Sequence, residues 1–301
     1  MAETWEDGER ALNQETIPLP DGRKLGYYVV GMGKPVVYFH GTASSRLEVL
    51  LLRELANSAR LKIIGIDRPG YGLSTFCPRA SLQDFNSDVN SLTGHLGFER
   101  FGVLGWSGGG AFALGYLACN PERVTTEVIA GAPALPFDVS TAHNMPLARF
   151  IMKTPFVGLF AMKRMRSQVL KANGDISTFL RSRQGRQMLH ACSKSDLKFF
   201  SDPAWLKLMY QSMAEAFRHN DGVKAVLIEH QAFMKPWPFS FSRIPAGKLF
   251  IWHGSEDKTC RVANSLLIAK SVAGAQLKIF EGAGHCVMFD NFGKLGKLLG
   301  S

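Results

Sequence analysis

A serine within a glycine-rich stretch is the residue whose surroundings most clearly indicate chemistry. Residues 101–104 are apolar, and they run into the sequence GWSGG at residues 105–109 and then into a helical pattern. A strand, a sharp turn and a helix in this order hold the serine in a strained backbone conformation, and Gly105 and Gly109 avoid a collision between the arms of the turn. The free N–H groups at the start of the helix stabilise an oxygen that becomes negative. The stretch therefore predicts that Ser107 is a nucleophile.

Two other interpretations of this stretch remain open from its residues alone. Residues 108–113 (GGGAFA) match G-x-G-x-x-A, a fingerprint of dinucleotide-binding loops, and a glycine-rich turn can also be purely structural. A serine hydroxyl needs a general base, which a carboxylate in turn orients. Asp257 follows an apolar strand predicted at 248–253, and His285 follows one predicted at 277–281. Because the carboxyl ends of parallel strands meet at one edge of a sheet, these strand ends favour a catalytic triad of Ser107, Asp257 and His285.

Each partner of the serine also has an alternative. Asp257 could cap the helix that follows it, and the neighbouring Glu256 could serve as the carboxylate instead. His285 could be a packed core histidine, although its glycine-rich turn favours exposure in a site. His253, at the end of its strand, is predicted to be structural.

An oxyanion hole is the other requirement of acyl transfer. One predicted donor is the backbone N–H of Gly108, the residue after the nucleophile. The other is the N–H of Thr42, in the loop that follows an apolar strand predicted at 36–39.

Short apolar strands alternate with helices along most of the chain. Strands are predicted at 16–20, 24–31, 36–39, 61–66, 101–104, 123–130, 248–253 and 277–281, and helices at 47–58, 81–96, 107–120, 262–272 and 287–299. The first two strands are joined by the hairpin turn Asp21-Gly22, and Ser81 is the predicted N-cap of its helix. This alternation is typical of an α/β fold with a mostly parallel central sheet flanked by helices.

Residues 137 to about 239 break this rhythm. They are helical in pattern, basic and rich in Met and Phe, with no clear strand. We therefore predict an α/β core at residues 1–135 and 241–301 and a helical insertion at residues 136–240.

Composition and charge exclude several classes of protein. The 301 residues carry a net charge of +10, but residues 1–135 hold 12 Lys and Arg against 14 Asp and Glu, whereas residues 136–240 hold 15 against 7. Without a basic stripe interleaved with aromatic residues, we expect no nucleic acid partner. The five cysteines are scattered and lack metal-ligand spacing, so we expect no disulfide framework and no metal site. The acidic N-terminus and the lack of a long apolar run predict a cytoplasmic protein without stable membrane insertion.

Five motifs together resemble those of one known family. They are HGT at 40–42, DRPGYGLS at 67–74, GWSGG at 105–109, HGSED at 253–257 and GAGH at 282–285. The chain is similar in these motifs to the α/β-hydrolase superfamily, in particular to its lid-bearing serine hydrolases of the esterase and lactonase type. The resemblance covers about residues 16–135 and 240–300. It implies the α/β-hydrolase fold, the Ser-Asp-His triad, a lid (cap) formed by the insertion, and no organic cofactor.

Two details refine this resemblance. A serine nucleophile speaks against haloalkane dehalogenases and standard epoxide hydrolases, which use a carboxylate at this position. The acid loop lacks the proline that is often found a few residues after the carboxylate, and residues 260–263 (CRVA) stand there instead.

The insertion is predicted to shape the substrate pocket and to exclude water from it. The pocket candidates are His40, Trp106, Met145, Phe150 and Val287. Residues 145–165 mix large apolar and basic side chains, which is typical of an apolar pocket, of a membrane-surface helix or of an amphipathic helix with its apolar face on the core. The basic residues at 163–166 and 181–186 could receive an anionic substrate tail, although solvated faces are commoner.

These observations predict a serine hydrolase that cleaves a small, mainly apolar ester, lactone or thioester through an acyl-enzyme on Ser107. One alternative is a C–C bond hydrolase or a non-hydrolytic lyase, cyclase or epimerase on the same scaffold. Another is a ligand-binding, receptor-like protein with a nearly idle triad. A small-molecule substrate is the expected partner, and neither its identity nor the oligomeric state follows from the sequence.

Overall fold

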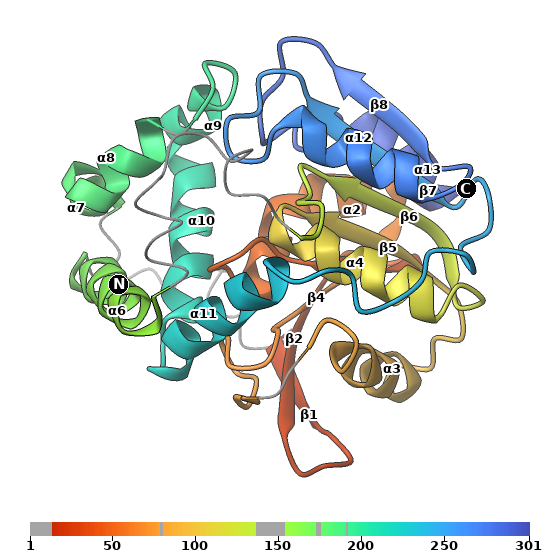
Figure 1. Cartoon of the computed structure of the whole chain (residues 1–301), viewed down its shortest axis with the longest axis horizontal. Coiled ribbons are helices and arrows are strands. Elements are labelled where there is room, and N and C mark those ends of the chain that lie inside the picture. Colours follow the sequence, from red (N-terminus) through yellow and green to blue (C-terminus); the bar gives the residue numbers. More distant parts are fainter. Residues whose placement is uncertain (1–13, 79–80, 137–153, 173–175, 191) are drawn as a thin grey trace.

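One sheet organises the protein, and its central strands are parallel. The computed structural model describes residues 14–78, 81–136, 154–172, 176–190 and 192–301, and within them eight strands follow the order β1-β2-β4-β3-β5-β6-β7-β8 (Figure 1). β1 and β2 pair antiparallel, as do β2 and β4, and all other neighbours are parallel. The strands are β1 (Gln14–Pro18), β2 (Lys24–Val30), β3 (Lys34–Phe39), β4 (Leu61–Ile66), β5 (Phe101–Trp106), β6 (Val124–Ala130), β7 (Leu249–Gly254) and β8 (Gln276–Phe280).

Helices cover both faces of this sheet. One face carries the 3-10 helix η1 (Arg46–Leu52) with α2 (Arg53–Ala59) and α13 (Phe292–Gly300), and the other carries α3 (Phe85–His95), α4 (Gly108–Cys119) and α12 (Val262–Ser271). Each face has its own hydrophobic core. In β3, Val36 and Tyr38 enter the core under η1, α2 and α13, whereas Val37 and Phe39 enter the core under α3, α4 and α12, because side chains alternate across a strand. All four are buried, which explains why the central strands are apolar without interruption.

A group of helices lies between β6 and β7 in the chain, in the range predicted to be helical. It comprises α6 (Pro155–Lys171), α7 (Ile176–Arg181), α8 (Arg183–His190), α9 (Leu197–Ser201), α10 (Pro203–Ala216) and α11 (Asp221–Phe233), and we call it the helical segment. In Figure 1 it stands beside the sheet, next to the edge at which β5 ends. Phe179, Tyr210 and Phe217 are buried in a third core within it. None of the described helices has the length and apolar character that crossing a membrane requires.

Three helices differ from their predicted form. The predicted helix 47–58 is divided into η1 and α2. α3 begins at Phe85 rather than after Ser81, because Ser81 and Asp84 close a separate turn in which each side chain accepts the other's N–H. α13 begins at Phe292 rather than at Val287, since residues 286–289 are buried in a turn. Their apolar pattern reflects burial under the sheet, not helical periodicity.

Candidate active site

The turn between β5 and α4 carries Ser107 in the strained conformation that the sequence predicts. Its backbone has φ 53° and ψ −129°, and a non-glycine residue in such a sparsely populated region costs about 1–3 kcal/mol. Close packing requires the two glycines around it. A Cβ on Gly105 would lie 2.8 Å from the Cβ of Ala113, and a Cβ on Gly109 would lie 2.1 Å from the carbonyl oxygen of Phe39. The turn therefore holds Ser107 at the N-terminus of α4.

His285 and Asp257 come together from the loops after β8 and β7. Nδ1 of His285 lies 2.8 Å from Oδ2 of Asp257, and both side chains are buried. A carboxylate at this distance favours the proton on Nδ1 and leaves Nε2 as the acceptor. Burial lowers the pKa of His285, but the carboxylates of Asp257, Asp196 and Glu48 together more than offset this effect, so the pKa of His285 lies above its usual range.

The second oxygen of Asp257 holds its own loop. Oδ1 accepts the backbone N–H groups of Thr259 and Cys260 at 2.8 and 2.9 Å, whereas α12 begins only at Val262. Asp257 therefore caps a turn in front of the helix, and Oδ2 still faces His285.

The two neighbouring candidates have other positions. The side chain of Glu256 is exposed. His253 is fully buried, with Nδ1 2.6 Å from the hydroxyl of Ser265 and Nε2 2.6 Å from the carbonyl oxygen of Cys260. Both ring nitrogens of His253 are engaged, which agrees with the structural role expected for it.

Ser107 and His285 line one cavity of about 300 Å³. Within the described residues, no hydrogen bond joins the Ser107 hydroxyl to His285, and Nε2 of His285 has no hydrogen-bond partner there. Catalytic hydrogen bonds are often long or poorly aligned without substrate and tighten when it binds. Nε2 is therefore the ring atom left to act on a serine in the same cavity.

The two residues predicted to supply the oxyanion donors lie next to each other. A Cβ on Gly108 would be 2.1 Å from Oγ1 of Thr42, so the loop after β3 directly contacts the first turn of α4. Neither backbone N–H donates to another residue in the described ranges. Unpaired N–H groups at a helix N-terminus are suited to bind an oxygen that becomes negative.

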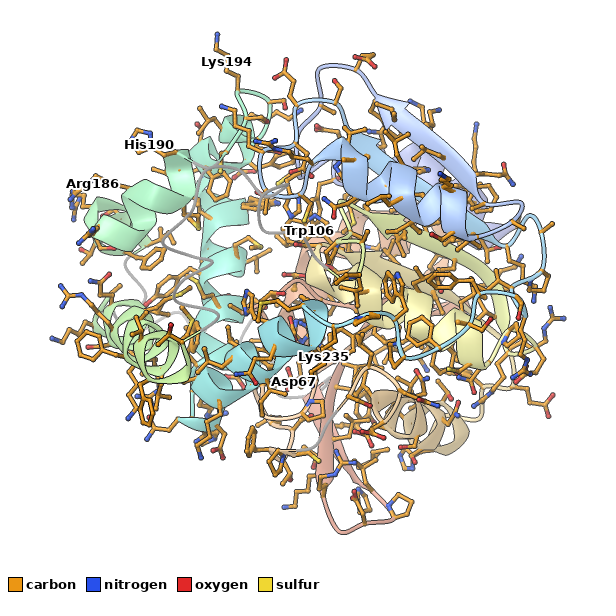
Figure 2. All side chains as sticks on the ribbon, in the orientation of Figure 1. Asp67, Trp106, Arg186, His190, Lys194 and Lys235 are labelled. Carbon is orange, nitrogen blue, oxygen red and sulfur yellow. The ribbon has the colours of Figure 1, made fainter. Side chains whose placement is uncertain are left out.

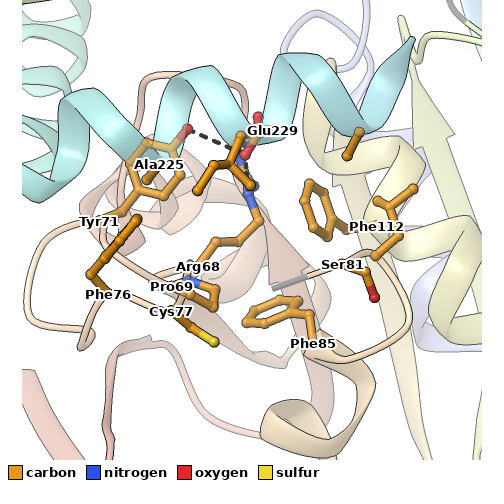
Figure 3. Close-up of a pocket in the computed structure, with 13 residues that line it drawn as sticks. Arg68, Pro69, Tyr71, Phe76, Cys77, Ser81, Phe85, Phe112, Ala225 and Glu229 are labelled. Carbon is orange, nitrogen blue, oxygen red and sulfur yellow. Dashed lines mark hydrogen bonds and ion pairs between the residues drawn. The ribbon is translucent and has the colours of Figure 1, made fainter. Parts of the chain in front are cut away.

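A buried ion pair between Arg68 and Glu229 lies under α11 (Figure 3) and contacts the loop that carries Thr42. Arg68 follows β4, and its Nε lies 2.8 Å from Oε2 of Glu229 on α11. Arg68 also donates to the carbonyl oxygens of His40 and Gly41, and Oγ1 of Thr42 donates to Oε1 of Glu229 at 2.6 Å. A helix from the helical segment therefore helps to fix the loop that carries Thr42, the second predicted oxyanion donor.

The pocket drawn in Figure 3 is separate from the cavity of Ser107. It has a volume of about 30 Å³, and neither Ser107 nor His285 is among the described residues that line it. Its size suits about two water molecules, so we assign no substrate to it.

Glu48, on η1, supports the same loop from another side. Its Oε1 accepts the Gly41 N–H at 2.8 Å and the Tyr38 hydroxyl at 2.6 Å. Burial raises the pKa of the Glu48 carboxyl, although these donors oppose the shift. The loop at residues 40–42 is thus held by one carboxyl from the core and one from the helical segment.

Apolar side chains form most of the cavity wall around Ser107. Those from the helical segment include Met165, Ile176, Met188, Phe200, Met209 and Met213. Trp106 also lines the cavity, as expected, and Figure 2 places it at the boundary between the helical segment and the sheet.

The other pocket candidates lie elsewhere. His40 and Val287 are not among the described residues that line the cavity. His40 is buried behind its loop, with Nδ1 2.8 Å from the carbonyl oxygen of Gly41, because the chain turns its ring into the protein at the end of β3. Val287 packs into the core under the sheet. Met145 and Phe150 lie outside the described residues.

The basic residues of the helical segment face away from the cavity. Lys163 and Arg164 are exposed, and Figure 2 shows Arg186 and Lys194 at the outer edge of the molecule. The described residues that line the cavity include no Lys or Arg. An anionic substrate tail therefore finds no Lys or Arg in the described wall, and the exposure of these residues agrees with solvated faces rather than with the alternative of an anion-binding role. Within the same ranges, no group of three or more His, Cys, Asp or Glu side chains could hold a metal ion.

Sequence reasoning missed four charged residues around this site: Glu48, Arg68, Asp196 and Glu229. Arg68 lies inside the motif at 67–74, so its position there was a usable signal. Glu48 closely follows the loop of Thr42. Asp196 and Glu229 lie in the helical segment, where no local pattern distinguishes them from solvated charges.

Comparisons with known proteins agree on the alpha/beta hydrolase fold. A family model described as alpha/beta hydrolase fold matches residues 34–292. A proline iminopeptidase of Xylella fastidiosa (strain 9a5c) is 28% identical over 286 residues, which cover 88% of this chain and 88% of that protein. An esterase from Exiguobacterium antarcticum has a TM-score of 0.66 at 21% identity, over 94% of this chain and 96% of that one. An alpha/beta hydrolase fold protein from Nakamurella multipartita has a TM-score of 0.69 at 19% identity, over 95% and 99%.

Proposed function

Because the chain belongs to the alpha/beta hydrolase fold family, we propose that it is a serine hydrolase that cleaves a small, mainly apolar carboxylic ester, lactone or thioester. One observation carries this proposal. Ser107 stands at a strained turn on the wall of a cavity that it shares with His285, and His285 is hydrogen-bonded to Asp257. Such an arrangement supplies a nucleophile, a base and an orienting carboxylate together.

The proposed reaction has two halves. In the first, Nε2 of His285 takes the proton of Ser107 while Oγ attacks the substrate carbonyl carbon, and Asp257 stabilises the imidazolium that forms. The N–H groups of Gly108 and Thr42 hold the oxyanion. His285 then protonates the leaving alcohol or thiol, which departs from the acyl-enzyme. In the second half, His285 takes a proton from water, the resulting hydroxide attacks the acyl carbon, and Ser107 regains its proton.

The cavity supports a neutral, mainly apolar substrate. Its wall in the helical segment consists largely of methionine and other apolar side chains, and the described residues that line it include no Lys or Arg. Flexible methionines repack easily around different apolar groups. In this proposal the helical segment acts as a lid whose side chains select the acyl or alcohol part of the substrate.

A peptidase that removes an N-terminal residue is the second candidate, because proline iminopeptidases are among the relatives. Such an enzyme must bind a free amine, which calls for an available carboxylate. Two carboxyl groups line the described cavity, those of Glu48 and Asp196, and both are buried. Both oxygens of Asp196 accept hydrogen bonds, whereas Glu48 accepts through Oε1 and its Oε2 has no hydrogen-bond partner among the described residues. Because burial raises the pKa of the Glu48 carboxyl, the charged form that would bind an ammonium group is disfavoured, and this favours the ester over the free amino terminus.

Hydrolysis of a p-nitrophenyl ester series of rising acyl length tests the proposal. Turnover should depend on Ser107, and Ser107→Ala should lower kcat by about 10⁴-fold or more, because the nucleophile is lost. Ser87→Ala, which changes an exposed serine on α3, is the matched control and should retain full turnover. Equal turnover by wild type and Ser107→Ala would contradict the proposed nucleophile.

Two parallel assays separate the alternatives. Cleavage of proline p-nitroanilide without cleavage of any ester would favour the peptidase. Mass analysis of products formed in ¹⁸O-labelled water distinguishes hydrolysis of an ester or of a C–C bond, which places the label in the acid product, from lyase, cyclase or epimerase chemistry, which does not. The second product, an alcohol or thiol for the ester and a compound with a new carbon-bound hydrogen for the C–C bond, separates the two kinds of hydrolysis.

A further inference from the structure

The carboxylate of Asp196, between α8 and α9 of the helical segment, accepts backbone N–H groups of the loop after β8 that carries His285, which we call the histidine loop. Asp196 precedes α9, and its Oδ1 accepts the N–H of Cys286 at 2.8 Å while its Oδ2 accepts the N–H of His285 at 3.0 Å. The Ser193 hydroxyl donates to the same Oδ2 at 2.8 Å, and the Asp196 N–H donates back to the Ser193 hydroxyl oxygen at 3.1 Å. Asp196 thus joins a turn of the helical segment to the residue proposed as the general base.

The fit between these two turns leaves no spare space. A Cβ on Gly284 would lie 2.1 Å from Oδ2 of Asp196 and 2.1 Å from the Ser193 hydroxyl oxygen. Asp196 is 3% exposed and Ser193 is fully buried. The histidine loop can therefore approach Asp196 this closely only because residue 284 has no side chain.

The hydrogen bonds to Asp196 favour its charged form although the side chain is buried. Burial raises the pKa of its carboxyl, but the hydrogen bonds from Cys286, Ser193 and His285 outweigh burial, so the pKa lies below its usual range. Among the residues that the structure describes, Asp196 makes no ion pair with a Lys or Arg. A positive charge on His285 is therefore the charge that this carboxylate is placed to stabilise.

Several other groups also act on His285. Asp257 faces it from the loop after β7, Glu48 acts on it from η1, and His253 lies behind Asp257. Asp257 binds the ring directly, whereas Asp196 binds the backbone of the same residue. The two carboxylates therefore act on His285 from different sides.

We propose that Asp196 is a positioning residue that holds the His285 loop and stabilises the imidazolium formed when Ser107 loses its proton. This inference rests on the proposed serine hydrolase function. In this inference the helical segment takes part in catalysis, because the carboxylate of Asp196 fixes the position of His285 and favours its protonated form.

Asp196→Asn tests the role of the charge, and Ser193→Ala is its matched control. Asparagine keeps the size of the side chain and one acceptor oxygen but removes the negative charge. Ser193→Ala removes a hydrogen bond from the same turn and leaves the charge in place. The first measurement is an NMR titration of ¹⁵N-labelled histidine, with the His285 signal assigned through His285→Gln.

The wild-type imidazole of His285 should titrate above the usual histidine pKa of about 6.5. In Asp196→Asn its pKa should fall by about 0.5–1 unit, because a nearby negative charge is gone. The acidic limb of kcat/KM for the best p-nitrophenyl ester should move to lower pH by the same amount. The kcat of Asp196→Asn should fall about tenfold with little change in KM, since the His285 loop is less firmly positioned. In Ser193→Ala the limb should stay at the wild-type position.

The inference is overturned if His285 titrates in folded Asp196→Asn as it does in wild type, or if Ser193→Ala shifts the limb equally. Should Asp196→Asn not fold, Asp196→Ser supplies the same comparison with a smaller neutral acceptor. The NMR titration does not depend on turnover. A wild-type protein that hydrolyses no ester would therefore refute the proposed function, while the titration would still decide the role of Asp196.

Discussion

The two halves of the helical segment are attached to the rest of the protein in different ways. The inner helices, α10 and α11, make polar contacts with the sheet and the helices that cover it, which we call the sheet domain. Oε1 of Glu215 lies 2.9 Å from Nη1 of Arg46, and Oε2 of Glu229 lies 2.8 Å from Nε of Arg68. The Ser212 hydroxyl is also 2.8 Å from that of Ser44. These contacts involve the loops next to β3 and β4, which border the proposed oxyanion hole.

The outer helices, α6 to α8, show the opposite character. Phe156 and Phe160 of α6 are 86% and 68% exposed. The contact of Arg166 with the carbonyl oxygen of Phe217 joins α6 to the end of α10 and not to the sheet domain. The outer helices nevertheless supply Met165 and other apolar side chains to the cavity.

Under the proposed function, the inner helices fix the oxyanion loop as well as lining the cavity, whereas the described residues of the outer helices contribute only apolar side chains to its wall. Buried charges with fixed partners tolerate little displacement, because an unpaired buried charge is costly. Apolar walls tolerate substitution much better, since packing is less directional than hydrogen bonding. The inner helices should therefore be constrained by the proposed oxyanion loop, and the outer helices should be free to vary with the substrate.

The largest effect is expected from Glu229→Leu. This change leaves the guanidinium of Arg68 buried without its carboxylate and should reduce the free energy of unfolding by about 3–5 kcal/mol. Urea denaturation measures the loss. Asp221→Ala, at an exposed ion pair on the same helix, is the control and should cost less than about 1 kcal/mol. Equal losses in both variants would show that the inner attachment carries no special weight.

An intermediate effect is expected from Met188→Ala on α8. It enlarges the cavity, so the preferred p-nitrophenyl ester should have a longer acyl chain, with a change of about tenfold in the kcat/KM ratio of long to short esters. Met162→Ala removes a methionine of α6 that is not among the described residues lining the cavity, and should leave this ratio unchanged. A ratio that stays the same in Met188→Ala would place the selectivity elsewhere.

The smallest effect is expected from Phe160→Ala on the exposed face of α6. Its free energy of unfolding should stay within about 0.5 kcal/mol of wild type, because the ring has little packing to lose. Phe179→Ala makes the same chemical change at a buried position of the helical segment and should cost about 3–5 kcal/mol. Thermal and urea unfolding of the pair provide the measurement. A large loss in Phe160→Ala would mean that the outer face is covered in solution and would remove the contrast between the two halves.

Much of the sheet domain followed from local pattern. Short apolar strands, the hairpin turn at Asp21-Gly22 and the glycines around Ser107 are signals within a few residues of one another. The predicted starts of two helices were wrong. At residues 287–291, buried apolar side chains in a turn produce a pattern like that of a helix, and at Ser81 a separate turn precedes the helix.

The sequence by itself determined the strand–turn–helix around Ser107 and the order in which Asp257 and His285 follow strand ends, because those features depend on neighbouring residues and on the rule that parallel strands end at one edge. Only the tertiary structure decided which charges of the helical segment reach that edge. Asp196 meets a backbone N–H 89 residues away, and Glu229 meets a hydroxyl 187 residues away. No local periodicity encodes such contacts, since they arise when the helical segment packs against the sheet domain and desolvates the carboxylates that find partners there.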